Sequence, residues 1–161
     1  MKEVLELDEL DIKLLELLQM NSRVTISELS KQLVLSRPSV SERLQRLQER
    51  GIIEEFTARV SLPAVGLDIL LFIQVSELKR TPHELEEFME NENAVIECHR
   101  VTGTTNYVLK AAVSNMASMS LLIDRLIPFG SLTTSIVLSS PIPYRVIQPE
   151  KGNAAAEKVK S

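Results

Sequence analysis

The side chains best suited to chemistry in this sequence gather in one short segment, residues 36–46. They combine cations, hydroxyls and an amide at the start of an expected helix: Arg37, Pro38, Ser39, Ser41, Glu42, Arg43, Gln45 and Arg46. Hydroxyls and backbone N–H groups near a helix start suit phosphates, because the helix dipole favours an anion there. Arginine can pair with guanine O6 and N7, and glutamine with adenine N6 and N7. We therefore expect this segment to contact double-stranded DNA.

The position of each residue on that helix suggests its role. Arg46 and Gln45 are expected on the outward arc, where they reach base edges, whereas Arg37 and Arg43 lie closer to the flanks and suit phosphates. Glu42 repels the DNA backbone, although its carboxylate can accept a hydrogen bond from cytosine N4. The competing interpretation is an amphipathic helical bundle whose charged face contacts only water.

Three short helices must position these side chains. Apolar residues recur at helical spacing in each: Leu10, Leu14 and Leu18, then Ile26, Leu29 and Leu33, then Val40, Leu44 and Leu47. Thr25 and Glu28 form a capping box that starts the second helix, and Ser36 caps the third. Pro38 fits the first turn of the third helix, and Gly51 suits its end. This pattern predicts a helix-turn-helix, whose second helix enters the DNA major groove.

The charge is distributed as such a motif requires, although the chain carries a net charge of −4. Residues 21–50 contain six basic and three acidic side chains, a local excess of +3, whereas residues 1–20 sum to −4. The small excess predicts modest electrostatic steering and an affinity that depends on several copies binding together.

Composition also bounds the function classes. A lone Cys98 excludes an internal disulfide framework, and on a strand Cys98 and His99 point to opposite faces, so they do not form a nucleophile–base pair. We expect no enzymatic activity, no cofactor and no metal. The chain has no apolar run of about 18 residues and no apolar signal region, so we expect a cytoplasmic, nucleoid-associated protein without a membrane partner.

The C-terminal half follows a different order: strand, helix, strand, strand, helix, strand. Residues 67–75 are almost wholly apolar, as expected for a strand covered on both faces. Thr81, Pro82 and Glu84 start the first helix, and Met116 opens the second amphipathic run. Strands are expected at 94–102, 106–113 and 132–139, the first two joined by a hairpin turn. The order predicts a ferredoxin-like βαββαβ sandwich and an α+β fold for the whole chain.

These patterns divide the chain into four parts. Residues 1–60 form the helix-turn-helix domain with an exit strand at 52–60, and residues 61–66 form a linker marked by Pro63 and Gly66. Residues 67–147 form the αβ-sandwich domain. Residues 148–161 have no apolar period and are expected to be a disordered tail.

The sequence resembles the leucine-responsive/AsnC (feast/famine) family of prokaryotic transcription factors. The resemblance rests on Ser36, Ser39-Val40, Arg43-Leu44, Leu47, Gly51-Ile52-Ile53 and Gly66, together with the domain order, over roughly residues 8–140. It implies a regulator of amino-acid metabolism or transport, with a C-terminal ligand-responsive (RAM) domain. In such motifs the tight turn often carries glycine. Here it carries β-branched Val34, which tolerates positive φ poorly.

The resemblance also implies an effector site between neighbouring dimers, usually for an amino acid. The family's Gly-x-x-Asp-Tyr element corresponds to Gly103, Thr104, Thr105, Asn106 and Tyr107, with Asn in place of Asp, which removes a negative charge that would face the ammonium. The family also carries a Thr-x-Thr element, in which Leu132 of this chain replaces the first threonine and Thr134 corresponds to the second. Thr133 and Thr134 complete the candidate effector site. The alternative is that Gly103 and Asn106 only form a turn and Tyr107 belongs to the core.

The partners follow from these expectations. One face of a four-stranded sheet needs cover, and sheet-to-sheet dimerisation of the chain with itself provides it and pairs two recognition helices. The resemblance implies further assembly, up to octamers. Two other interpretations remain open: a nucleoid-structuring DNA-binding protein without a ligand, and a sensor module whose helical half docks onto protein.

Overall fold

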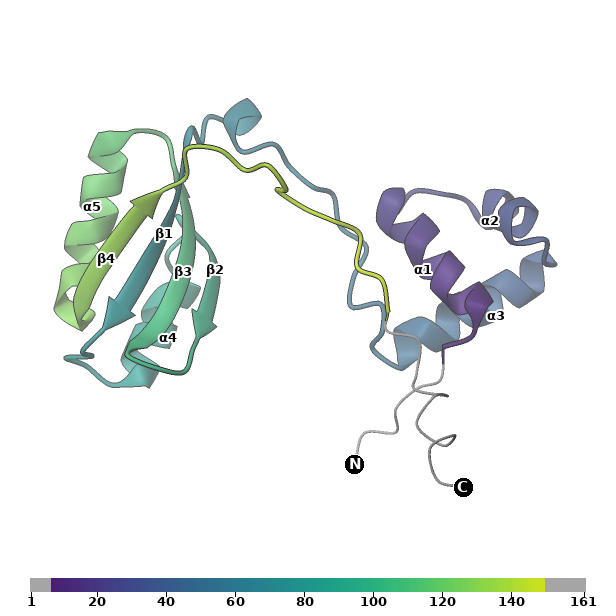
Figure 1. Cartoon of the computed structure of the whole chain (residues 1–161), viewed down its shortest axis with the longest axis horizontal. Helices are drawn as coiled ribbons and strands as arrows, with labels where there is room; N and C mark the ends of the chain where they lie inside the picture. Colours follow the sequence, from purple (N-terminus) through teal and green to yellow (C-terminus); the bar gives the residue numbers. More distant parts are fainter. Residues whose placement is uncertain (1–6, 150–161) are drawn as a thin grey trace, which may run out of the picture. The chain divides into compact units, whose positions relative to one another are not determined.

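The computed structural model describes residues 7–149, which form two compact units (Figure 1). The helical unit contains the chain up to Ala58 and the described residues from Ile142 onward, and the αβ unit contains residues 59–141. The helical unit has the three helices that the sequence predicts: α1 (Glu9–Met20), α2 (Ile26–Leu33) and α3 (Arg37–Glu49).

Each helix of the helical unit begins at a side-chain cap. Asp8 caps α1 and Thr25 caps α2, each in a reciprocal capping box, and Ser36 accepts a hydrogen bond from the backbone N–H of Ser39 at the start of α3. The caps satisfy backbone donors that the first helical turn leaves unpaired. The predicted caps at Thr25 and Ser36 are confirmed. The unit's core is aliphatic and consists of Leu14, Leu15, Leu18, Leu29, Leu33, Val40 and Leu47.

The turn between α2 and α3 places Val34 in the left-handed region, at φ 54° and ψ 45°. Its side chain is 89% exposed, so burial does not offset the steric cost of this backbone conformation. Hydrogen bonds on both sides hold the turn: the N–H of Leu35 donates to the carbonyl of Ser30, and the Ser30 hydroxyl donates to the carbonyl of Leu35. The chain therefore keeps the usual turn geometry with a residue that is poorly suited to it.

Replacing Val34 with glycine should stabilise the helical unit by about 1 kcal/mol, because glycine adopts the left-handed region without a Cβ clash. Urea unfolding followed by circular dichroism would measure the change. Val34→Ala is the matched control: it removes the β-branch but keeps the Cβ, so the gain should be smaller. A lower unfolding midpoint for Val34→Gly would contradict this account of the turn.

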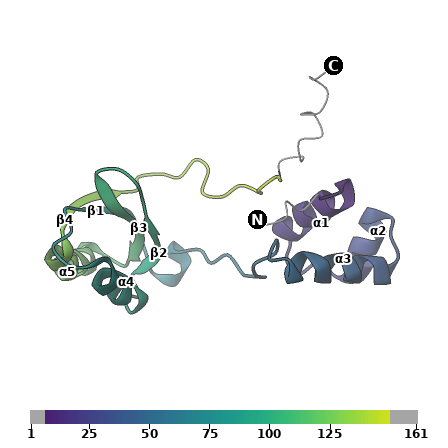
Figure 2. The same cartoon turned by 90° about the horizontal axis from the view of Figure 1, so that it is seen from below.

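The αβ unit has the predicted βαββαβ order. Its elements are η1 (Pro63–Val65), β1 (Ile69–Ser76), α4 (Pro82–Glu90), β2 (Val95–Arg100), β3 (Thr105–Val113), α5 (Met116–Leu126), η2 (Ile127–Phe129) and β4 (Ser131–Ile136). The sheet order is β2-β3-β1-β4, and every neighbouring pair is antiparallel. Both helices pack on the same face of the sheet (Figure 2).

The second face of this sheet is open in the single chain. Leu71, Ile73 and Val75 of β1 point to the helices and are fully buried, whereas the alternating Phe72 and Gln74 are exposed. The expectation that residues 67–75 are covered on both faces is therefore not met within one chain. Polar and charged side chains are interspersed with the apolar ones on the open face.

Two predicted boundaries differ from the structure. Residues 54–60 belong to neither a helix nor a strand, so within the described residues the predicted exit strand at 52–60 is not formed. The described residues from Ile142 onward group with the helical unit rather than with the αβ unit that was expected to run to residue 147. Of the predicted tail at 148–161, residues 150–161 lie outside the described residues.

Candidate nucleic-acid interface

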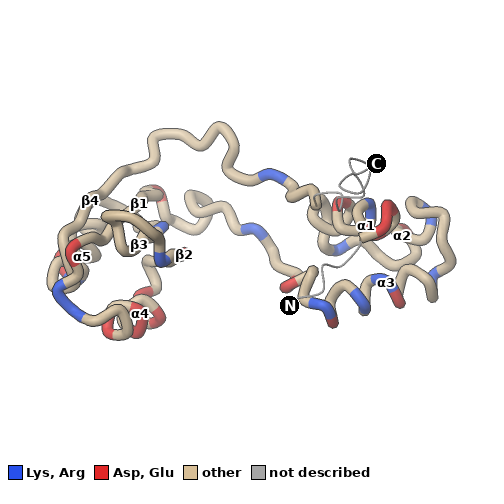
Figure 3. The backbone as a smooth tube through the Cα atoms, turned by 60° about the horizontal axis from the view of Figure 1, so that its bottom comes forward, with Lys and Arg blue, Asp and Glu red and all other residues tan. Residues whose placement is uncertain are grey.

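Helix α3 presents a polar, solvent-exposed face. Arg37, Pro38, Ser41, Glu42 and Gln45 are exposed. Basic and acidic residues both occur along the helix (Figure 3), so its exposed face is not uniformly positive. The amide of Gln45 donates to Oε1 of Glu49 at 2.7 Å, which holds its side chain along the helix surface. This face can offer hydroxyls, an amide and one guanidinium to a polar partner.

Ser39 takes part in the helix cap. Its hydroxyl lies 2.7 Å from the Ser36 hydroxyl, and its backbone N–H donates to Ser36 Oγ at 3.3 Å. Two hydroxyls and the first backbone amides of α3 thus lie together at the helix N-terminus. Such an arrangement favours an anion, because the helix dipole is positive at that end.

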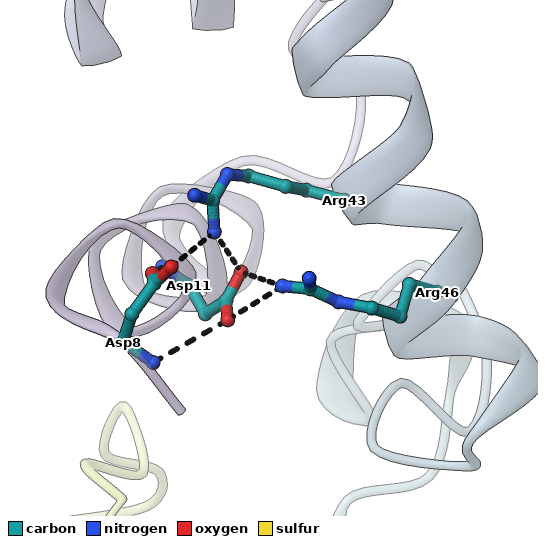
Figure 4. Close-up of polar contacts among 4 residues, drawn as sticks. All are labelled: Asp8, Asp11, Arg43 and Arg46. Atoms are coloured by element: carbon teal, nitrogen blue, oxygen red, sulfur yellow. Dashed lines mark hydrogen bonds and ion pairs between the residues drawn. The ribbon is translucent and has the colours of Figure 1, made fainter. Parts of the chain in front are cut away.

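Arg43 and Arg46 turn toward α1, where they pair with two carboxylates (Figure 4). Nη1 of Arg43 lies 2.6 Å from Oδ2 of Asp8 and 2.7 Å from Oδ1 of Asp11. Nη2 of Arg46 donates to both oxygens of Asp11 at 2.8 Å. Asp11 is 2% exposed, so its charge is balanced within the protein by the two guanidinium groups. We call these four residues the α1–α3 clasp.

The clasp differs from the expected outward placement of Arg46. Arg43 follows buried Val40 by three positions and precedes buried Leu47 by four, so it shares the side of α3 that packs on α1. The side chains of Arg43 and Arg46 are 21% and 42% exposed. The spacing from Val40 was the signal that indicated this position, but the acidic partners on α1 are not evident from α3 itself.

The clasp contacts shift the pKa of Asp8 and of Arg43. For Asp8, partial burial opposes ionisation, but the backbone N–H of Asp11 and the Arg43 guanidinium outweigh it and lower the pKa. Hydrogen bonds to Asp8 and Asp11 raise the pKa of Arg43. Since the pKa of Asp8 is lower in the folded protein than its ordinary 3.8, its contribution to stability is present above that pH. The contribution is lost as the pH falls through the lower, folded-state pKa.

The candidate effector residues divide between two faces of the αβ unit. Gly103 forms the β2–β3 turn at φ 104°, and Thr104 beside it is exposed. Thr133 pairs with Gln74 on the open face, and the Thr105 hydroxyl donates to Oε1 of Gln74 at 3.4 Å. Gln74, which the sequence does not single out, therefore links the β2–β3 turn element to the threonines of β4.

Three other candidate effector residues are placed differently. Thr134 pairs with buried Ile73 and so shares the face that carries the helices. Tyr107 is 1% exposed, and its hydroxyl donates to Oε1 of Glu86. Burial, followed by this carboxylate, raises the pKa of Tyr107 to about 12. The backbone carbonyl of Asn106 accepts a hydrogen bond from the N–H of Val101 at 2.9 Å, so Asn106 supports the turn. Tyr107 belongs to the core, as the alternative interpretation of this element expected.

Within residues 7–149 no three His, Cys, Asp or Glu side chains are grouped so that they could hold a metal ion. Cys98 pairs with Leu109 and His99 with Val108, so the two side chains point to opposite faces of the sheet, as expected. No helix in the described part of the chain is long and apolar enough to cross a bilayer.

Two protein-family profiles match the chain, one over the three helices of the helical unit and one over the αβ unit together with residues 142–147. Residues 7–54 match a winged helix-turn-helix DNA-binding family, and residues 70–147 match the Lrp/AsnC ligand binding domain. The second match begins in β1 and ends at residue 147, where the αβ-sandwich domain was predicted to end.

Relatives that span most of the chain are transcriptional regulators. The HTH-type transcriptional regulator YezC of Bacillus subtilis is 34% identical over 83% of this chain and 95% of its own length. The leucine-responsive regulatory protein of Haemophilus influenzae is 32% identical over 69% of each chain. Among solved structures, the transcriptional regulator NMB0573 of Neisseria meningitidis, in complex with L-Met, is 31% identical. It aligns with a TM-score of 0.80 over 88% of this chain and 96% of its own.

Proposed function

Because this chain belongs to the Lrp/AsnC family of DNA-binding transcriptional regulators, we propose that it controls genes of amino-acid metabolism or transport in response to an amino-acid effector. The chain carries the family's ligand-binding domain, and its relatives are regulators rather than enzymes. The observation that supports sequence-specific binding is the exposed polar face of α3, which contributes little to the core of its unit.

On this proposal, α3 uses different residues to read DNA and to stay folded. Gln45 reads an adenine edge, and Ser41 and Glu42 lie beside it on the exposed face. Arg37 and the hydroxyls of Ser36 and Ser39 bind a phosphate at the helix N-terminus. Arg43 and Arg46 hold α3 against α1, and Arg46, which is partly exposed, can also contact a phosphate.

Replacing Gln45 with alanine should weaken binding to a duplex selected by the unmodified protein by about 10- to 100-fold, because one bidentate base contact contributes about 1–3 kcal/mol. Arg37→Ala should weaken binding to all duplexes alike and reduce the salt slope by about 1. Fluorescence anisotropy at several salt concentrations would measure both effects.

The chain offers a matched control for this test. Glu49→Ala removes the same hydrogen bond from Gln45 but leaves the amide in place, so sequence preference should be unchanged. Equal loss of affinity for selected and random duplexes in Gln45→Ala would show that Gln45 does not read a base. Unchanged affinity in both Gln45→Ala and Arg37→Ala would remove α3 as the DNA-contacting element.

Self-association is the second part of the proposal. The open face of the sheet carries Phe72, 40% exposed and opposite Lys110, with the half-buried Val108 one pair further along, and a second copy of the chain would cover it. Such a dimer presents two α3 helices to two half-sites in DNA, and dimers would assemble further, up to octamers. Sedimentation of the purified chain would test this, and a monomer at micromolar concentration would contradict it.

An amino acid is the proposed effector. The neisserial relative was solved with L-Met, and the turn at Gly103, with Thr104, Thr105, Asn106 and Thr133, offers backbone amides and hydroxyls suited to a carboxylate. A thermal-shift screen of the twenty amino acids, with and without duplex DNA, would test this. A rise in melting temperature with one amino acid, together with a changed gel-shift pattern, is the expected result.

A nucleoid-structuring role without an effector is the alternative. It is favoured by Asn106, which lacks the negative charge of the family's aspartate, and by Tyr107, whose hydroxyl is bound to Glu86 in the core. This alternative predicts that no amino acid shifts the melting temperature. It also predicts weak discrimination between selected and random duplexes.

A further inference from the structure

Helix α1 binds a backbone segment from the far end of the chain. The amide of Gln19 donates to the carbonyl of Ile147 at 2.9 Å, and its Oε1 accepts from the N–H of Ile147, also at 2.9 Å. The two residues are 128 positions apart. A side-chain amide that pairs with both backbone polar groups of Ile147 satisfies a residue that lies in neither a helix nor a strand.

This pair lies where the chain returns to the helical unit. The polypeptide passes from the helical unit to the αβ unit after Ala58 and comes back at Ile142 (Figure 1). The described residues of the returning segment, 142–149, are assigned to the helical unit. The Gln19 amide also donates to the carbonyl of Leu15 at 3.3 Å, which fixes the side chain on the last turn of α1.

A second attached connection changes how freely two units can reorient. A single flexible linker allows many orientations, whereas a second connection that also ends on a fixed element allows fewer. The connections, from Ala58 to β1 and from β4 to Ile147, are each roughly a dozen residues long, so each spans at most about 40 Å. The hydrogen bonds at Gln19 attach the returning segment to α1 at Ile147, so their loss would loosen this attachment.

We propose that residues 142–149 form a strap that docks on α1, and that Gln19 is a positioning residue that makes this strap restrict the DNA-binding unit. The function of the strap rests on the proposed dimer with two half-sites. When the orientation of each helical unit is restricted, the second α3 finds its half-site at a higher effective concentration. Gln19 then affects binding to two half-sites without touching DNA.

Hydrogen exchange of the full chain without DNA tests the strap directly. In Gln19→Ala, a peptic fragment that contains Ile147 should exchange about 5- to 10-fold faster at that amide, because its acceptor is lost. Gln32→Ala on α2, an exposed glutamine in the same unit, should leave this exchange unchanged. Ile147→Pro removes the donor itself, so its effect is read as faster exchange at the neighbouring amides of the same fragment, and it keeps the test available if Gln19→Ala does not fold. Equal exchange in Gln19→Ala and the unmodified chain would overturn the strap.

DNA binding tests the positioning role. Gln19→Ala should bind a duplex with two half-sites about 3- to 10-fold more weakly, and a duplex with one half-site within about twofold of the unmodified chain. A merely destabilising substitution would weaken both equally, and that result would overturn the positioning role, as would unchanged affinity for both. If the unmodified chain bound both duplexes with the same affinity, the proposed two-site dimer and the positioning role of Gln19 would both be wrong. The docking of the strap on α1 is tested separately, by hydrogen exchange at Ile147.

Discussion

Replacing Asp11 with alanine should destabilise the helical unit by about 2–4 kcal/mol. The carboxylate is buried and accepts hydrogen bonds from both arginines of the α1–α3 clasp, so its removal leaves two guanidinium groups without their partner. Losing one partner of a buried ion pair typically costs about 3–5 kcal/mol. The value expected here is lower because Arg43 and Arg46 are partly exposed and can recover water.

Urea unfolding of the full chain would measure this loss, with circular dichroism separating the helical unit from the αβ unit. Asp8→Ala is the control on the exposed side of the clasp. It removes the α1 cap and one contact of Arg43, so its cost should be about 1 kcal/mol. If Asp11→Ala kept the stability of the unmodified chain but lost DNA affinity, the arginines would act mainly on DNA and the clasp would be secondary.

The second large effect is expected at Gly130, where η2 passes into β4. A Cβ at this position would lie 2.5 Å from the backbone oxygen of Ser76 and 3.2 Å from Cγ1 of Val75. The backbone there is extended, so the constraint is space rather than φ. Gly130→Ala must push β4 away from β1, and we expect a loss of about 2–3 kcal/mol in the αβ unit.

A glycine with room around it provides the control. Gly103 has no heavy atom within 4 Å of a built Cβ but lies at φ 104°, so Gly103→Ala should cost only about 1–2 kcal/mol, through strain. Thermal unfolding of both variants would compare crowding with strain. A Gly130→Ala variant as stable as the original chain would mean that β4 can shift along the edge of β1 at little cost.

Local patterns predicted most of the fold. Capping residues and apolar spacing located the three helices and the βαββαβ order, because both signals depend on residues a few positions apart. The exit strand failed for a related reason: β-rich composition at residues 52–60 indicates a strand only when another strand is available to pair with it.

The candidate site was predicted less completely. The exposed residues of α3 were found from helical spacing. The same spacing did not determine where Arg43 and Arg46 point, since a long cationic side chain can lie along the buried apolar side of a helix and reach a carboxylate at its edge. Their partners Asp8 and Asp11 lie 32–35 positions away. Gln74 and Gln19 were missed because their contacts depend on strand register and on a returning segment, which local patterns do not encode.

The clasp also bears on how binding preference can diverge between related regulators. Where one side chain both reads a base and packs within the protein, a change of specificity risks the fold. Here Ser41, Glu42 and Gln45 take no part in the hydrophobic core or the clasp. Gene duplicates could therefore exchange these three positions and acquire new operators while keeping one stable scaffold, and a combinatorial library confined to them would sample that range.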